Sequence, residues 1–521
     1  MYRNKGTITV FLSLISMLFL SLFCTMAESV RVQAARFQAA AAFDMGLFSI
    51  FGEYDRVLLE EYDLWFLDGS SEEQKIREVL ETKLEKYIQP NINPRYNLAA
   101  GRSWDVFPTE LDRCTVDKYA LATDHGGQVF YSQAVENQKE LFVGEAASAL
   151  KKNIKQMEEG HQKGEEYQNE EQKADEEYQR AQAAQMEEKK RQESEKENAE
   201  KQEESDIKET EAVQAKVENP LDQIKKIKSM GILGLVLKDG TVVSDKTIER
   251  KNLPSERNLQ KGSLLVNEIS ADPVSEAIFL NYLQKHFQCA VDEGGKHQKG
   301  SKEHSLSYEL EYIIGGQKSD RENLKKTVNR ILLIREGMNY ATLAKSAKMR
   351  GEAMALAAAI TGAAALPEFA GALQKLLMLA WAYGESLLDV RTLLAKGKVP
   401  MLKAETEWKL PLEKLGMLAE VLKECDAGGG NGQSYEDYLS GLLILGKKQQ
   451  RNLRVLDLIE CNRRMEKGGE TFRVDALVAQ AEASADFELA PVFLRVPAVW
   501  MHVRNQGTAY TIKGQYGYGQ P

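Results

Sequence analysis

An uncharged, strongly apolar run near the N-terminus constrains this chain more than any other feature. It extends from Thr7 to Ala27, TITVFLSLISMLFLSLFCTMA, and contains 21 residues without a charge. At ~1.5 Å per residue, a helix of this length spans about 30 Å, which is the thickness of the hydrocarbon core of a bilayer. The sequence therefore predicts one membrane-spanning helix, whose lipid-facing residues include Thr7, Phe11, Leu20 and Ala27.

The residues that flank this run indicate its orientation. Arg3 and Lys5 precede it, and the acidic Glu28 follows it directly. Because positive charge beside a span favours the cytoplasmic side, we expect a single-pass protein of the cell membrane with a cytoplasmic N-terminus and an extracytoplasmic bulk. Two alternatives are a cleaved secretory signal and a lipidated Cys24, but the small residues typical of either processing site are missing.

The helical pattern continues beyond the apolar run. Residues 28–51 are rich in alanine, and their apolar side chains recur at helical spacing. We therefore expect the membrane helix to extend outward, either as an ordinary stalk or as a pilin-like spine that packs against neighbouring subunits. The expected packing face consists of Val32, Ala35, Ala39 and Ala42.

The two ends of the apolar run carry a resemblance to a known family. The segments KGTITV, residues 5–10, and ESVRVQAAR, residues 28–36, resemble the TadE/TadG-like proteins of Flp (tight-adherence) pilus assembly, over roughly the first 45 residues. They are more closely similar to an uncharacterised family of Gram-positive membrane proteins. That second resemblance extends over most of the chain and implies no catalytic residues.

In pilin-like proteins, a prepilin peptidase cuts after a glycine that precedes the apolar run. Gly6 occupies the matching position, so the resemblance implies a cut between Gly6 and Thr7. The chain departs from the pilin pattern at Phe11, where a glutamate usually stands five residues after the cut.

Four segments follow from the composition along the chain, and the predicted fold class is mainly α with small α+β parts. Residues 1–52 form the anchor and pilin-like helix, and residues 53–150 form a membrane-proximal α+β unit with a turn at 124–127 and a helix from about Val129 to Lys151. Residues 151–218 form a charged, coiled-coil-like or disordered linker. Residues 219–521 form a mainly helical extracytoplasmic domain that ends in strands.

The linker prediction depends on charge. Residues 151–210 hold 12 Lys or Arg and 19 Asp or Glu, with few apolar side chains. Tyr167, Ala174 and Ala181 are seven residues apart, but the positions between them that a coiled coil needs are mostly polar. A solvated single helix or a disordered segment is therefore expected here.

Composition and motifs argue against several functional classes. Lys plus Arg is 68 and Asp plus Glu is 78, and the net charge of −10 argues against nucleic-acid binding. The sequence has no G-x-S-x-G, H-E-x-x-H or G-x-G-x-x-G motif. Five cysteines lie far apart without a CxxC pair, which excludes a zinc ribbon. We therefore expect no enzyme, no cofactor and no catalytic residues.

The best candidates for metal ligands lie within one window of 19 residues, and they are His286, Cys289, His297 and His304. These are residue types that zinc prefers, but their spacing fits no familiar zinc module, so no metal site is predicted. Residues 295–302 (GKHQKGSK) miss the phosphate-loop motif and are expected to form an ordinary loop.

Charged residues also fall inside strongly apolar helical segments. Glu309 and Glu311 are two residues apart, so one helix would place them on different sides. The pair Arg335–Glu336 is interpreted as part of a salt bridge within a helical bundle. The alanine-rich segments 352–366 and 369–388 are too short and too charged to span a membrane, so we expect buried bundle helices.

The C-terminal residues return to strand-like alternation at 493–497, 499–503 and 509–513. They carry basic and aromatic side chains that form either a contact surface or the last edge of a sheet. These side chains are Arg504, Tyr510, Lys513, Tyr516 and Tyr518.

Placement in the envelope therefore decides the expected function. We expect a non-enzymatic, membrane-anchored component or assembly factor of a Flp/Tad-type pilus or secretion apparatus. Its expected partners are the membrane, pilus or secretion proteins, and other copies of the chain. The alternatives are an anchored adhesion or sensory protein and, less favoured, an extracytoplasmic metal-dependent enzyme.

Overall fold

A computed structural model describes residues 5–70, 75–92, 107–139, 144–199, 219–238, 240–265, 269–270, 272–291, 303–363, 369–424, 430–494 and 507–518. The described chain is mainly α-helical with one small sheet, which confirms the predicted fold class. It divides into two compact units, each built from segments that are distant in the sequence. Unit 1 contains residues 1–140, 251–270 and 455–521, and unit 2 contains residues 141–250 and 271–454.

Unit 1 is organised around α1 (Lys5–Phe51), a single helix of 47 residues. The other helices and the strands of unit 1 are short by comparison. They are α2 (Arg56–Tyr62), β1 (Leu67–Asp68), α3 (Ile76–Ile92), β2 (Thr109–Leu121), α4 (Asp124–Gln138), the part of α15 (Lys448–Met465) from residue 455 on, β3 (Leu477–Leu489) and β4 (Thr508–Gly517).

The sheet of unit 1 is antiparallel throughout. β3 is its central strand, with β2 along one side and both β4 and the short β1 along the other. The register of β3 and β4 runs from Gln480 opposite Gly517 to Leu489 opposite Thr508. The strand predicted at 509–513 therefore lies in β4. Residues 495–503 of the other predicted strand segments lie outside the described residues, and so does Arg504.

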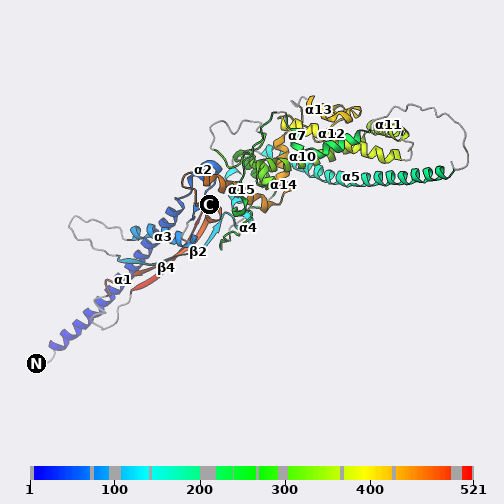
Figure 1. Ribbon diagram of the computed structural model, residues 1–521. Helices are drawn as coiled ribbons and strands as arrows, with labels where there is room; N and C mark the ends of the chain where they lie inside the picture. The colour runs from blue at the N-terminus through cyan, green and yellow to red at the C-terminus, as the bar shows by residue number, and fades with distance from the viewer. Residues whose placement is uncertain are drawn as a thin grey trace. The chain divides into compact units, whose positions relative to one another are not determined.

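The C-terminal half of α1 packs against this sheet and against α3 (Figure 1). Ala39, Ala42 and Phe43 of α1 share one buried cluster with Ala483 of β3 and Leu84 of α3. Gly514 of β4 makes this packing close, because a Cβ atom there would lie 2.9 Å from Cε1 of Phe43. Small residues on both elements therefore allow the helix to lie directly on the strands.

The turn predicted at residues 124–127 is present. His125, Gly126 and Gly127 all have positive φ angles, of 52°, 72° and 81°, and they reverse the chain between β2 and the rest of α4. The helix predicted from about Val129 to Lys151 is instead two helices, because α4 ends at Gln138 and α5 begins at Gly144.

Unit 2 is a bundle of helices. Its long members are α5 (Gly144–Ala199), α10 (Asp320–Lys345), α11 (Ala347–Ala363) and α12 (Ala370–Leu394). Its shorter members are α6 (Pro220–Ser229), α7 (Ile232–Val236), α8 (Pro273–His286), α9 (Glu309–Gly315), α13 (Leu418–Glu424), α14 (Tyr435–Leu445) and the first part of α15 (Lys448–Met465). Of the two buried bundle helices predicted, the one at 369–388 is confirmed, since α12 is buried from Leu376 to Leu393. The one at 352–366 is wrong over its described residues, because α11 buries only one side, through Ala353, Ala357 and Thr361, and is otherwise mostly exposed.

The charged segment after residue 151 is not a solvated linker over its first half. Met157, Tyr167 and Ala174 of α5 are at most 2% exposed, and they pack inside unit 2. The Tyr167 hydroxyl donates to the carbonyl of Leu379 in α12, at 3.0 Å. The prediction of a helix is confirmed as far as Ala199, and residues 200–218 of the predicted linker lie outside the described residues.

Glycines explain how a charged helix enters a bundle. Gly160 and Gly164 are one turn apart in α5; Gly337 of α10 lies against Gly164, and Gly160 faces Ile334 and Met338 of α10. A Cβ atom on Gly337 would lie 2.3 Å from the backbone nitrogen of Gly164. The two helix backbones therefore touch at this crossing, and no larger side chain fits between them.

This crossing yields a stability prediction. Gly337→Ala should lower the free energy of unfolding by about 3 kcal/mol or more, because backbone atoms of α5 cannot yield to the new methyl group. Thermal unfolding of the full chain in detergent measures the loss. Gly351→Ala in α11 is the matched control, since no atom lies within 4 Å of its Cβ position. Its expected effect is a gain of up to ~1 kcal/mol from helix propensity, and equal losses in both variants would contradict the crossing.

Candidate functional site

The N-terminal half of α1 is largely exposed and extends beyond the sheet (Figure 1). Phe11 is 63% exposed and Phe23 is 76% exposed, and Thr7 and Leu20 are exposed as well. Ala27, the last residue predicted for the anchor, is half-buried. Of the described helices, α1 is the one that is long and apolar enough to cross a membrane, a property that membrane anchors share with signal sequences.

The residues predicted to pack against neighbouring subunits are instead used within the chain. Ala35, Ala39 and Ala42 are at most 1% exposed, and Val32 is half-buried. Ala39 and Ala42 belong to the core that α1 shares with its own sheet and α3. This face of the helix therefore packs on its own sheet and α3, and the expectation that it packs against a neighbouring subunit is wrong.

A buried ion pair lies where α1 changes from bare to packed. The Glu28 and Arg31 side chains are 6% and 2% exposed, and the Arg31 guanidinium pairs with the Glu28 carboxylate. Arg31 also donates to the carbonyl of Ala490 at 2.6 Å. The backbone N–H groups of Val492 and Phe493 donate to Glu28 at 3.3 and 2.8 Å.

This pair fixes the segment after β3 to the N-terminal end of the packed part of α1. Burying a charge is costly unless it is paired and hydrogen-bonded, and here both conditions are met. Glu28 and Arg31 occur in the segment that carries the resemblance, but sequence reasoning assigned them no role. Their spacing of three residues directly after the apolar run is the signal that could have identified the pair.

Unit 2 contains a second, larger group of buried charges. Arg335 of α10 donates to Asp389 of α12 at 2.8 and 3.0 Å, and Lys403 pairs with both Asp389 and Glu385. Burial alone would raise the pKa of Asp389, but Arg335 and Lys403 hold it below its ordinary value. The predicted salt bridge within a bundle is therefore confirmed for Arg335, and its partner is Asp389.

Glu336, beside Arg335 in the sequence, is 8% exposed and faces a different environment. Burial raises its pKa to about 8; the charge of Lys228 lowers this pKa and the charge of Glu171 raises it. A buried carboxyl that is neutral near pH 7 adds no fixed charge to the helix crossing at Gly337.

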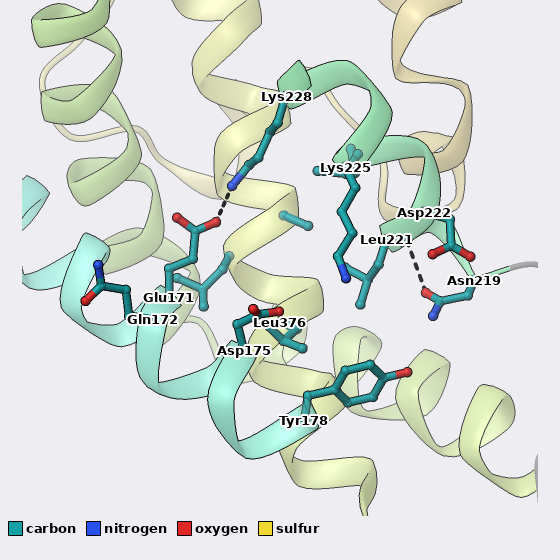
Figure 2. Close-up of a pocket in the computed structure, with 13 residues that line it drawn as sticks. Glu171, Gln172, Asp175, Tyr178, Asn219, Leu221, Asp222, Lys225, Lys228 and Leu376 are labelled. Atoms are coloured by element: carbon teal, nitrogen blue, oxygen red, sulfur yellow. Dashed lines mark hydrogen bonds and ion pairs between the residues drawn. The ribbon is translucent and has the colours of Figure 1, made fainter. Parts of the chain in front are cut away.

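Lys228 and Glu171 also line a cleft of unit 2, which Figure 2 shows. The cleft has a volume of about 450 Å³ and lies between α5, α6 and α12. Lys228 forms an ion pair with Glu171 and lies 4.8 Å from the ring centroid of Tyr383. The remaining lining residues are Gln172, Asp175, Tyr178, Asn219, Leu221, Asp222, Ile224, Lys225, Leu376, Leu379 and Ala380.

The cleft has a chemically mixed lining. Its lining combines an apolar floor with three carboxylates and two lysines, so it has no strong preference for one sign of charge. The lining side chains include no histidine, cysteine or serine, which are the usual partners in a nucleophile and base pair.

The predicted candidates for metal ligands do not come together in the part of the chain that the structure describes. His304 Nδ1 lies 2.9 Å from a carboxylate oxygen of Glu309, while the Cys289 thiol donates to the carbonyl of Val291 at 3.1 Å. The ring of His286 lies 4.7 Å from that of Tyr282. His297 and residues 295–302 lie outside the described residues, and among the rest no cluster of three potential ligands is found.

Glu309 and Glu311 were expected on different sides of a helix, but both bind the same extended segment. Glu309 accepts from the N–H of Gln288 at 2.9 Å, and Glu311 accepts from the N–H of Ala290 at 2.9 Å. Tyr435 also donates to Glu311 at 2.8 Å. Both carboxylates therefore hold the residues that follow α8, a structural role.

Comparison with known proteins adds one finding. Residues 209–489 match a family of unknown function, DUF5702, and this match covers more than half of the chain. The chain belongs to this family. The DUF5702 match includes parts of both units, from α6 to β3, and begins after α1. Searches of curated proteins and of solved structures give no match.

The Glu28–Arg31 pair yields a second prediction. Arg31→Gln leaves the Glu28 carboxylate buried without its counter-charge, which costs about 3–5 kcal/mol locally. Hydrogen–deuterium exchange at the amides of Val492 and Phe493 should become faster in this variant. Lys348→Gln removes one partner of an exposed pair with Glu352 and should change exchange little. Unchanged exchange in Arg31→Gln would contradict the role of the pair.

Glu336 yields a prediction about pH. Its pKa is about 8 in the folded state and 4.5 in the reference state, so the folded state binds more protons between these values. The free energy of unfolding should therefore fall as pH rises from about 4.5 through 8. Glu336→Gln should remove this fall and be more stable than the natural chain at pH 9 by about 2 kcal/mol or more.

Hydrogen–deuterium exchange of α10 at pH 5 and pH 9, compared between the two proteins at each pH, measures the effect. Equal protection at pH 5 and greater protection of Glu336→Gln at pH 9 are expected. A difference that is the same at both pH values would contradict the raised pKa.

Proposed function

We propose that this chain is a non-enzymatic, membrane-anchored envelope protein that acts as a pseudopilin-like component or assembly factor of a Flp/Tad-type pilus or secretion apparatus. Its N-terminus is cytoplasmic and the bulk of the chain is extracytoplasmic. The observation that carries the proposal is the division of α1 into a bare apolar half and a half packed on an antiparallel sheet.

Two further features support the proposal. Arg3 and Lys5 lie beside the apolar run and favour a cytoplasmic N-terminus. The resemblance of residues 5–10 and 28–36 to TadE/TadG-like proteins falls on the same helix. In this account the apolar half of α1 anchors the chain, and the packed half positions unit 1 at the outer surface of the membrane.

The cleft of unit 2 favours a second candidate, an anchored surface protein with a sensory or adhesive role that is unrelated to pili. The cleft has a volume of about 450 Å³ and a mixed polar and apolar lining, which suits a peptide or a small amphipathic molecule. This candidate needs the same anchor but different partners.

Affinity purification of the tagged, full-length chain from native membranes distinguishes the two candidates. Mass spectrometry should identify pilus or secretion components with the natural chain. It should also show whether the N-terminal peptide begins at Thr7, as cleavage after Gly6 would require. Recovery of the intact anchor without such components would favour the anchored surface protein.

A segment exchange tests the anchor itself. Replacing residues 7–27 with an unrelated membrane helix leaves the packed residues 28–51 unchanged, so unit 1 keeps its core. We expect the exchanged chain to stay in the membrane and to lose about ten-fold or more of its pilus partners, because lateral helix packing depends on the residues of the span. Unchanged recovery of the partners would contradict a specific role for this helix.

A further inference from the structure

The outer face of α1, beyond the predicted span, is apolar and exposed. Four large side chains on it are unusually accessible for apolar residues, with exposed fractions of 71% for Val30, 78% for Phe37, 48% for Met45 and 63% for Phe48. Val30, Phe37 and Met45 lie roughly opposite the face that packs on the sheet, whereas the Phe48 ring lies at the edge of that face, with its centroid 5.8 Å from that of Tyr516 in β4. Contiguous exposed apolar surface of this kind marks an interaction site.

Lipid cannot cover most of this face. Phe37 lies ten residues beyond Ala27, which is about 15 Å farther along the helix, and Phe48 lies about 30 Å beyond Ala27. Both rings are therefore outside the hydrocarbon core when residues 7–27 fill it. A protein surface is the remaining cover for them.

The spacing of the exposed residues indicates a helix as that surface. Val30, Ala34, Phe37, Ala41, Met45 and Phe48 recur at intervals of three and four residues. This recurrence forms a narrow seam along one side of a helix, and such a seam pairs with the same kind of seam on another helix.

The same seam continues into the span, where its chemistry changes. Extending the spacing toward the N-terminus reaches Ala27, Phe23 and Leu20, and then the small polar residues Ser16, Ser13 and Thr9. Large apolar side chains drive helix pairing in water, whereas small and hydroxyl side chains favour it in lipid. The seam therefore has small polar residues within the span and large apolar residues beyond it, as expected for a helix interface that passes from lipid into water.

We propose that α1 pairs in parallel with α1 of a second copy of this chain, along the seam from Thr9 to Phe48. Two copies of one chain enter the membrane at the same depth, so their seams meet in register without any further alignment. Identical residues of the two helices then face each other, with Ser13 beside Ser13 in the lipid and Phe37 beside Phe37 in the water.

The flanking charges are compatible with this pairing. The Arg36 guanidinium lies 5.4 Å from the ring centroid of Tyr510 in β4, and is thereby held toward its own sheet. Asp44 is exposed and lies beside Met45 at the rim of the seam, where water can solvate it. The inference rests on the membrane anchorage in the proposed function but does not depend on the pilus assignment.

Cysteine cross-linking of the full chain in native membranes tests the pairing. In a chain whose five cysteines are replaced by serine, Phe37→Cys places a thiol on the seam and Arg36→Cys places one about 100° away from it. Mild oxidation should give a disulfide-linked dimer of Phe37→Cys and at least about ten-fold less of it with Arg36→Cys. Equal yields, or cross-links from Phe37→Cys to a different protein alone, would overturn the proposal.

Co-purification of two differently tagged copies gives an independent readout. Phe37→Glu should lower recovery of the second copy by about ten-fold, since it places a charge in the centre of the seam. The matched control is Leu265→Glu, which changes an 84% exposed leucine of unit 1 outside α1 and should leave recovery unchanged. Both substitutions fall on exposed side chains, so neither disturbs the core, and equal recovery for both would overturn the pairing.

These outcomes separate the pairing from the pilus role. A cross-linked dimer without pilus or secretion components would support the pairing and contradict the proposed function. Recovery of those components without any α1 cross-link would support the proposed function and overturn the pairing.

Discussion

In the proposed anchor role, unit 1 depends on one continuous helix, α1, whose first half lies in lipid and whose second half lies in water. Residues 7–27 of α1 carry no charge on any side, and the second half of the helix is apolar toward its sheet and along one outer seam. The Glu28–Arg31 pair lies at the change between them, and its hydrogen bonds to Ala490, Val492 and Phe493 fix the chain that leaves β3. The apolar half of α1 and the sheet of unit 1 are thus joined by one continuous helix.

Both units use small residues to bring backbones together. In unit 1, Ala483 of β3 and Gly514 of β4 allow α1 to lie close to the sheet. In unit 2, Gly164 and Gly337 allow the charged helix α5 to enter the bundle. Close approach increases the number of dispersion contacts per residue, which compensates for the few large side chains that α5 contributes.

The helix of α1, the mainly helical fold and the strand at β4 could be predicted from sequence, since each has a strong period. β3 was missed because LVAQAEASADFEL is rich in alanine and poor in β-branched residues, so that burial in the sheet rather than propensity makes it a strand. The packing of α5 was missed because its many charged residues indicate a solvated segment, whereas the only signal of close packing is a pair of glycines four residues apart. The partners of Arg335 and Glu28 join distant segments, which spacing along the chain cannot predict.

The central claim is that α1 stays attached to the folded chain and holds it in the membrane. Alkaline carbonate extraction of native membranes, followed by mass spectrometry of the N-terminal peptide, tests this claim most directly. The account predicts that the chain remains in the membrane pellet and that its N-terminal peptide includes residues 7–27. Recovery of a chain that begins after Ala27 in the soluble fraction would show that the run is a cleaved signal, and would contradict the account.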